Sequence, residues 1–214
     1  MSKRVVRYAR FDCQNLRAEG DGDALPAILG TAIVYGVVGD GGFFTEEIKA
    51  GAATKTLERI ADPEKQNDCV CLFNHDPNLI VGRTPDTLTL EDTDAGLETR
   101  CTPPDTTIAR DLIANIRSGV IKQMSFGFYI LDEDVEIRDN RPHFTIKEIE
   151  LFDVSHVTWP FYKETSSSIE ERIKSRETNL DERLRQASGE APDLSRYKTF
   201  LRHLDRKRKV FSLR

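Results

Sequence analysis

The sequence predicts a mainly β protein with few helices, of the α+β class, followed by a charged, helix-prone tail. Short β-branched runs recur at close spacing between turn signals, and only one long amphipathic helix pattern lies among them. The composition changes near Lys163, where β-forming residues become scarce. We therefore expect a domain over 1–162 and a tail over 163–214, with the strands of the domain arranged as a barrel or a sandwich.

The strands are expected where apolar runs or alternating patterns lie between Gly, Pro, Asn and Asp residues. These segments are 5–11, 28–38, 68–73, 79–83, 87–91, 97–101 and 120–131, with a long hairpin of 135–137 and 143–158. A turn is expected at 40–42, where Asp precedes two glycines.

Three helices are expected in the domain. A short one opens over 44–48 with Thr45 as its N-cap, and a second covers 54–61. The third opens at residues 103–106 and runs to Ser118, because its apolar residues recur at the spacing of one helix face. Gly119 ends it.

The tail is basic, whereas the domain is acidic. Residues 163–214 hold 14 Lys and Arg against 9 Asp and Glu, and the remaining residues hold 17 against 27. Two helical stretches are expected, at 167–187 and 193–209, each either a solvent-exposed helix or a helix that needs a partner. Nucleic-acid binding through Arg206–Lys209 is disfavoured.

The four cysteines, at positions 13, 69, 71 and 101, favour reduced, buried thiols over a disulfide framework. A metal site of Cys69, Cys71 and His75 is disfavoured, because the spacing is not CxxC and no second ligand pair follows. We expect no metal and no cofactor. No apolar run reaches the roughly 18 residues that span a bilayer, and no signal-peptide pattern opens the chain.

Three short segments contain residues suited to catalysis. His75 stands at the corner after an apolar strand, and Ser125 lies in a run of Met, Phe, Gly and Tyr. Asp153 lies between Phe and Val, so its carboxylate must be paired or exposed. A turn histidine, a solvated serine and a surface carboxylate are the alternatives to a catalytic set. Gly127 would let a substrate backbone approach closely.

Strand alternation places residues 151, 153 and 155 on one face of the expected strand and His156 on the other. If Asp153 accepts a hydrogen bond from His75, it fixes the imidazole tautomer for proton abstraction from Ser125. The motifs GxSxG, GxGxxG and HExxH and the phosphate-binding P-loop are absent from the sequence.

Taken together in chain order, the blocks resemble the prohead (capsid maturation) proteases of tailed bacteriophages, which are similar to the herpesvirus assemblins. The resemblance covers about residues 28–162 and is carried by ILGTAIVYG, GGFFTEEIKAGAA, LFNHD, VGRT, LTLEDTDAGLETR, IRSGVIKQMSFGFYI and ELFDVSHVTWP. It implies a closed β-barrel with peripheral helices and a serine endopeptidase without a cofactor.

The resemblance also implies roles for individual residues. Ser125 in MSFGF is the nucleophile, His75 in NHD is the general base and Asp153 in LFDVS is the orienting acid. The family usually has Glu in that last block, so Asp153 is shorter by one methylene. His156 is a rival, since the assemblins use a histidine as third member. Weaker rivals are Glu148 and Glu150, and backbone amides or Arg83 are candidates for stabilising the oxyanion.

The implied activity is cleavage of the scaffold, of the scaffolding segment of the major capsid protein, and of the protease itself. The tail from about residue 166 onward would then bind scaffold or capsid protein and be trimmed on maturation, with a solvated, disordered tail as the alternative. Cleavage would take place in the host cytoplasm, inside the assembling procapsid. The oligomeric state of the active enzyme is left open, and a homo-oligomer is one alternative. An inactive protease-like scaffold or assembly factor is the alternative function. A zinc hydrolase that uses His75 and nearby thiols is a third, and it predicts inhibition by chelators.

Overall fold

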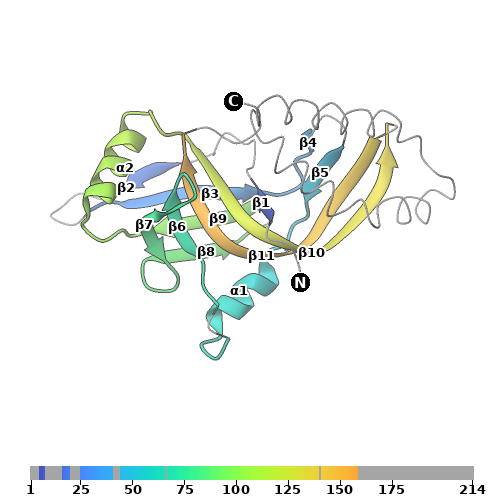
Figure 1. Ribbon diagram of the computed structural model, residues 1–214, viewed down its shortest axis with the longest axis horizontal. Helices are drawn as coiled ribbons and strands as arrows, with labels where there is room; N and C mark the ends of the chain where they lie inside the picture. The colour runs from blue at the N-terminus through green and yellow to red at the C-terminus, as the bar shows by residue number, and fades with distance from the viewer. Residues whose placement is uncertain are drawn as a thin grey trace, which may run out of the picture.

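The computed structural model describes six stretches of the chain (Figure 1), namely 5–7, 16–19, 25–40, 44–65, 67–139 and 141–158. The helix predictions for 167–187 and 193–209, the role of Arg206–Lys209, and Cys13 lie outside these residues.

The described residues form strands in two sheets together with two helices. The strands are β1 (Val5–Arg7), β2 (Arg17–Glu19), β3 (Ala27–Val34), β4 (Gly39–Asp40), β5 (Thr45–Ile48), β6 (Val70–Phe73), β7 (Asp76–Arg83), β8 (Leu88–Asp92), β9 (Gly96–Cys101), β10 (Gln123–Arg138) and β11 (Arg141–Val157). The helices are α1 (Thr54–Ala61) and α2 (Thr107–Arg117).

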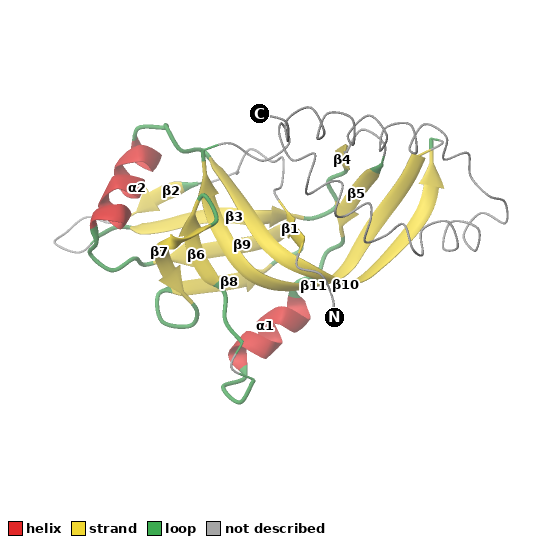
Figure 2. Cartoon of the chain, in the orientation of Figure 1, coloured by secondary structure: helices red, strands yellow, loops and turns green. Residues whose placement is uncertain are grey.

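The larger sheet has the order β1-β10-β11-β5-β4, with β6 paired to β11 and β7 paired to β6. The smaller sheet has the order β2-β3-β9-β8. Helix α2 packs against β2 and β7, and α1 packs against β8 and β11 (Figure 2). The mainly β, α+β class is therefore confirmed. The described strands make two sheets and no single closed one, so the closed barrel stays unconfirmed.

One hydrophobic core joins both sheets and α2. Ile33 and Leu97 enter it from the smaller sheet, Phe126 and Leu151 from the larger sheet, and Leu112 from α2. All five side chains are buried. Burial of large apolar side chains is the dominant stabilising contribution to folding. This shared core therefore holds the two sheets against each other.

Both longer helix predictions are confirmed. Helix α1 has the expected bounds, and α2 begins one residue after the expected opening. Thr106 caps α2, since its side chain accepts a hydrogen bond from the amide of Ala109. Gly119 follows the helix with φ +72°, the left-handed conformation that ends many helices. No described helix is both long and apolar enough to cross a membrane.

The helix predicted over 44–48 is wrong, because Thr45–Ile48 is strand β5. This segment pairs in parallel with His143–Ile146 of β11, and β4 pairs on its other side. The Thr45 hydroxyl lies 2.8 Å from Nδ1 of His143 and does not cap a helix. Asp40, expected in a turn, lies in β4. Two ladders of hydrogen bonds thus override a local capping signal.

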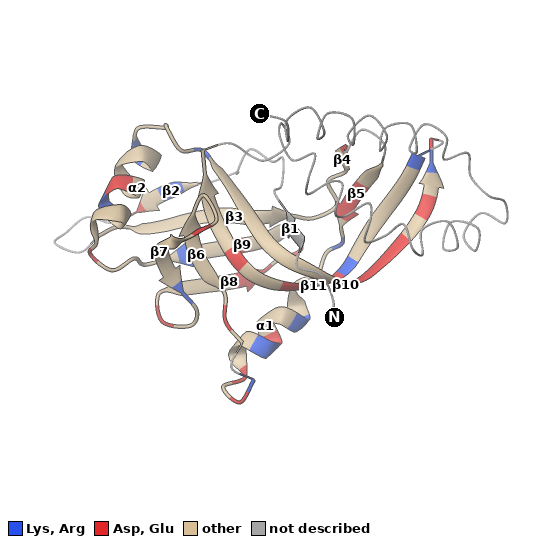
Figure 3. Ribbon diagram, in the orientation of Figure 1, with Lys and Arg blue, Asp and Glu red and all other residues tan. Residues whose placement is uncertain are grey.

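The β10–β11 hairpin is the longest element of the fold. Its far half, which pairs with β5, extends beyond the smaller sheet (Figure 1). Acidic side chains line the far part of β10 (Figure 3). Lys147 of β11 lies 3.0 Å from Asp132 and 2.9 Å from Asp134, so part of this acidic surface is neutralised across the strands.

Candidate active site

The candidate residues lie where β11 runs between β10 and β6. Ser125 of β10 pairs directly with Ser155 of β11, and Ser155 pairs with Leu72 of β6. Directly opposed residues of neighbouring strands project from the same face, with Cα atoms about 4.5–5.5 Å apart. Ser125 and Ser155 therefore lie side by side, and both are fully buried.

Asp153 lies on this face too, and a β-bulge follows it in the direction of Leu151. Gly127 pairs with Asp153 and the next residue, Phe128, pairs with Leu151, so Phe152 is an extra residue in β11. The alternation expected for 151, 153 and 155 therefore holds for Asp153 and Ser155 and is wrong for Leu151. Leu151 opposes Phe128 in the core, whereas Asp153 lies on the face of Ser125.

The space above Gly127 is filled by the protein itself. A Cβ atom at this position would lie 2.0 Å from Oδ2 of Asp153 and 2.4 Å from Cε2 of Phe152. The interpretation that Gly127 admits a substrate backbone is therefore wrong for the described conformation. Because Gly127 has no side chain, the Asp153 carboxylate can occupy the space above this residue of β10.

Substitution Gly127→Ala is expected to displace the Asp153 carboxylate. Overpacking of this kind costs about 1–3 kcal/mol of folding free energy, and activity should fall with the loss of the orienting acid. Urea unfolding and the cleavage rate would measure both effects. Gly36→Ala is the comparison, since no heavy atom lies within 4 Å of a Cβ there, although its positive φ makes Ala strained. Unchanged activity in Gly127→Ala would contradict this role.

His75 occupies a two-residue turn between β6 and β7. Both turn residues have positive φ, 55° at Asn74 and 56° at His75, as a type I′ hairpin turn requires. Asn tolerates this conformation, but the second position ordinarily takes Gly. A non-glycine residue held there costs about 1–3 kcal/mol, and such local strain is concentrated at functional sites.

Asn74 ties this turn to the end of β11. Its amide N–H donates to the carbonyl of His156 at 2.9 Å, and its side-chain oxygen accepts from the amide of Thr158, also at 2.9 Å. Its Nδ2 donates to the Thr158 hydroxyl at 3.2 Å. The corner that carries His75 is therefore fastened to the strand that carries Asp153.

The imidazole of His75 and the carboxylate of Asp153 are in direct contact. Nδ1 lies 2.6 Å from Oδ1, and the two side chains are only 9% and 4% exposed. Since a carboxylate can only accept, Nδ1 carries the proton of this bond, and in the neutral ring Nε2 holds the lone pair. The same Oδ1 accepts a hydrogen bond of 2.7 Å from the hydroxyl of Ser155.

His156 lies on the opposite face of β11, so it is separated from the His75–Asp153 pair by the strand. It pairs with Met124 and Phe73, and its Nδ1 lies 3.8 Å from Sγ of Cys71. Burial lowers the pKa of His156 to about 4, against a backbone hydrogen bond at Leu72 that raises it.

This buried histidine is expected to make the fold acid-sensitive. Above pH 6.5 the His156 ring is neutral in both states, and below it the unfolded chain binds a proton that the native chain refuses. The free energy of unfolding should therefore fall by at most about 3 kcal/mol as the pH drops from 6.5 toward 4. Urea midpoints across that window should fall less in His156→Gln than in wild type. Parallel curves would contradict the assignment.

The two glutamates considered as weaker candidates for the third catalytic residue have other partners. Glu148 binds Lys55 at 2.6 Å and lies 3.8 Å from Arg59 of α1. Glu150 pairs with Tyr129 beyond the bulge.

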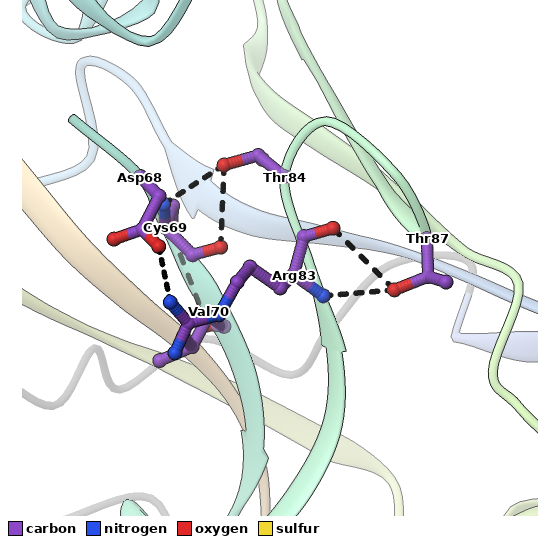
Figure 4. A network of polar contacts seen from close by, with 6 residues as sticks. All are labelled: Asp68, Cys69, Val70, Arg83, Thr84 and Thr87. Atoms are coloured by element: carbon purple, nitrogen blue, oxygen red, sulfur yellow. Dashed lines mark hydrogen bonds and ion pairs between the residues drawn. The ribbon is translucent and has the colours of Figure 1, made fainter. Parts of the chain in front are cut away.

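Arg83, a candidate for stabilising the oxyanion, binds Asp68 at the start of the β6 segment (Figure 4). Thr84 and Thr87 hold the backbone around it, through bonds to Cys69 and to Arg83 itself. Arg83 thus has a structural ion pair in this conformation.

Three cysteines lie among the described residues, all free and buried. Burial raises the pKa of the Cys69 thiol. A hydrogen bond with Cys101, followed by burial, raises that of Cys71. These raised pKa values favour the protonated forms of Cys69 and Cys71. No group of three or more His, Cys, Asp and Glu side chains in the described stretches is arranged to hold a metal ion.

Two participants in this arrangement were not predicted from the sequence, Ser155 and Asn74. The spacing of Ser155 from Asp153 places both on one strand face, but only the tertiary contacts reveal the hydrogen bond. Asn74 precedes His75, and its preference for positive φ is the signal that could have identified it.

Comparisons with known proteins find relatives among phage prohead proteases. The prohead protease of Escherichia phage T5 is 28% identical to the chain over 123 residues, which are 58% of this chain and 55% of that protein. The chain thus spans about half the length of that relative. The solved capsid assembly protease of bacteriophage T4 is 14% identical with a TM-score of 0.40, covering 75% of this chain and 97% of the other.

The family described as caudovirus prohead serine protease matches residues 14–179. This match covers well over half of the 214 residues and includes His75, Ser125 and Asp153. It confirms the resemblance drawn from the sequence blocks. The chain therefore belongs to the caudovirus prohead serine protease family of bacteriophage capsid assembly and maturation.

Proposed function

We propose that this chain is an endopeptidase in which Ser125 is the nucleophile, His75 the general base and Asp153 the orienting acid. The observation that carries the proposal is the 2.6 Å contact between Nδ1 of His75 and Oδ1 of Asp153. That contact lies on the sheet face from which Ser125 projects. A base oriented by a carboxylate beside a serine is the arrangement that activates a hydroxyl for acyl transfer.

In the proposed reaction, Oγ of Ser125 attacks the scissile carbonyl while Nε2 of His75 takes its proton. Asp153 stabilises the imidazolium that forms and keeps its own charge. His75 then returns the proton to the leaving amine, which leaves an acyl-enzyme on Ser125. Water, deprotonated by the same imidazole, hydrolyses the ester and regenerates the hydroxyl.

Membership of the family supports substrates that belong to the assembling particle. We infer cleavage of the scaffold, of the scaffolding segment of the major capsid protein and of the chain itself, inside the procapsid. From the same family membership we also infer a closed β-barrel and a homo-oligomer as the active form. The alternative is a protease-like assembly factor without activity, which would not need the strained turn that holds His75 against Asp153.

The burial of Ser125 bears on when the enzyme acts. Its side chain is fully buried in the described conformation, so a peptide can reach Oγ only after neighbouring groups move. Closure and opening of this kind gate many enzymes. It favours a protease that is latent until its assembly partners are present.

The proposal is tested by incubating the full chain with the purified capsid and scaffold proteins of its phage, then recording intact masses over time. We expect new masses that correspond to internal cleavage, unaffected by a chelator. Cleavage abolished by the chelator would indicate the zinc hydrolase. Stable masses of every component, with His75→Gln and wild type identical, would indicate the inactive assembly factor.

A further inference from the structure

We propose that Ser155 is a positioning residue of the active site, which holds the Asp153 carboxylate in the orientation that His75 requires. This inference rests on the proposed function and extends it to a fourth side chain. Ser155 takes no part in the bonds that form or break. It acts only through Asp153.

The geometry for this role is direct. Oγ of Ser155 donates to Oδ1 of Asp153 at 2.7 Å, and the same oxygen receives the bond from Nδ1 of His75 at 2.6 Å. Two donors on one oxygen fix both the rotation of the carboxyl group and the direction of its lone pairs. Ser155 therefore sets the oxygen against which the imidazole is aligned.

The other carboxylate oxygen is constrained from the opposite side. Oδ2 of Asp153 fills the space above Gly127, where Phe152 also lies. The carboxyl group is thus held by a hydrogen bond at one oxygen and by packing at the other. Rotation of the group would break the first constraint, so loss of the Ser155 hydroxyl leaves only packing to orient it.

The burial of Ser155 and Asp153 increases the stabilisation that their hydrogen bond contributes. Ser155 is fully buried and Asp153 is 3% exposed, so water is not at hand to replace the hydroxyl. A buried hydrogen bond to a charged group contributes more than one between neutral groups, because the alternative is an unsatisfied charge.

Ser155 is also the direct cross-strand neighbour of Ser125. The two hydroxyls can be confused in a chemical experiment, but their expected roles differ. Ser125 forms the covalent intermediate, whereas Ser155 stays uncharged and bonded to Asp153. Removal of Ser125 must abolish turnover, and removal of Ser155 must only slow it.

The test compares Ser155→Ala and Ser155→Thr in the full chain. The imidazole N–H proton of His75, assigned by its loss in His75→Gln, is followed by NMR as a far-downfield resonance. We expect it to broaden and exchange faster with water in Ser155→Ala, and to return in Ser155→Thr, which keeps the hydroxyl. With the purified capsid and scaffold proteins present to relieve latency, the rate of Ser125 labelling by a fluorophosphonate should fall about ten- to a hundredfold in Ser155→Ala and recover in Ser155→Thr.

Thr45→Val is the matched control, because it too removes a buried, hydrogen-bonded hydroxyl from the same sheet, but one that contacts His143 and not the Asp153 carboxylate. It should lower stability without changing the His75 resonance. A wild-type resonance in Ser155→Ala would overturn the proposal, as would a labelling rate equal to wild type. If Ser125→Ala were labelled as fast as wild type, the proposed function itself would fail, which is a separate result.

Discussion

Substitution Ser125→Ala is expected to lower the rate of peptide cleavage by a factor on the order of 10³ or more, while the protein stays folded. The change removes only Oγ, the atom that would form the acyl-enzyme. Ser125 is buried and paired with Ser155 in β10, and the smaller Ala side chain fits where Ser stands. Intact masses of substrate and enzyme, taken over time beside the wild type, measure the effect.

Two comparison variants make this result specific to one hydroxyl. Ser118→Ala removes the serine that follows α2, whose hydroxyl bonds the carbonyl of Asn115. It should leave cleavage unchanged. Ser155→Ala should retain part of the activity. If Ser125→Ala cleaved at the wild-type rate, another residue would have to supply the nucleophile.

Substitution Asp153→Asn is expected to lower the rate by about 10³- to 10⁴-fold, because a neutral amide of the same shape fails in two ways. It cannot stabilise the imidazolium of His75. Its NH2 group can also face Nδ1, which favours the wrong tautomer of the ring. Single-turnover cleavage would show the loss in the chemical step, with substrate binding retained.

Asp134→Asn is the control for a change of charge on the same hairpin. Asp134 is exposed and lies 2.9 Å from Lys147 in the far half of β10. A surface ion pair contributes at most about 1 kcal/mol, so activity should stay near wild type. Equal losses in both variants would point to a general electrostatic effect, and an unaffected Asp153→Asn would exclude its orienting role.

The bulge in β11 is a feature of the fold that the sequence pattern does not predict. Alternation predicts the pairing of polar and apolar positions correctly on either side of Phe152. It cannot reveal an inserted residue, because a bulge depends on the partner strand. The open position at Gly127 accommodates both Phe152 and Asp153, and that accommodation exists only after the strands pair.

At Thr45 the local sequence pattern predicts the wrong secondary structure. Its local pattern is that of a helix N-cap, yet the segment becomes a strand because β11 and β4 offer backbone partners on both sides. Capping contributes about 1 kcal/mol, which a pair of strand ladders exceeds. Helix α1, whose pattern has no competing partner, lies where the sequence predicts it.

The sequence by itself determined the β-rich class, the two longer helices, the family and the candidate residues Ser125, His75 and Asp153. These depend on periodicity and on residue blocks, both of which are local properties. Only the tertiary structure decided which groups meet: the His75–Asp153 contact spans 78 positions and Thr45–His143 spans 98. The bond from Ser155 is close in sequence, but the space for the Asp153 carboxylate above Gly127 exists only once β10 and β11 pair. Side-chain contacts of this kind depend on strand register, which is set by the packing of the whole sheet.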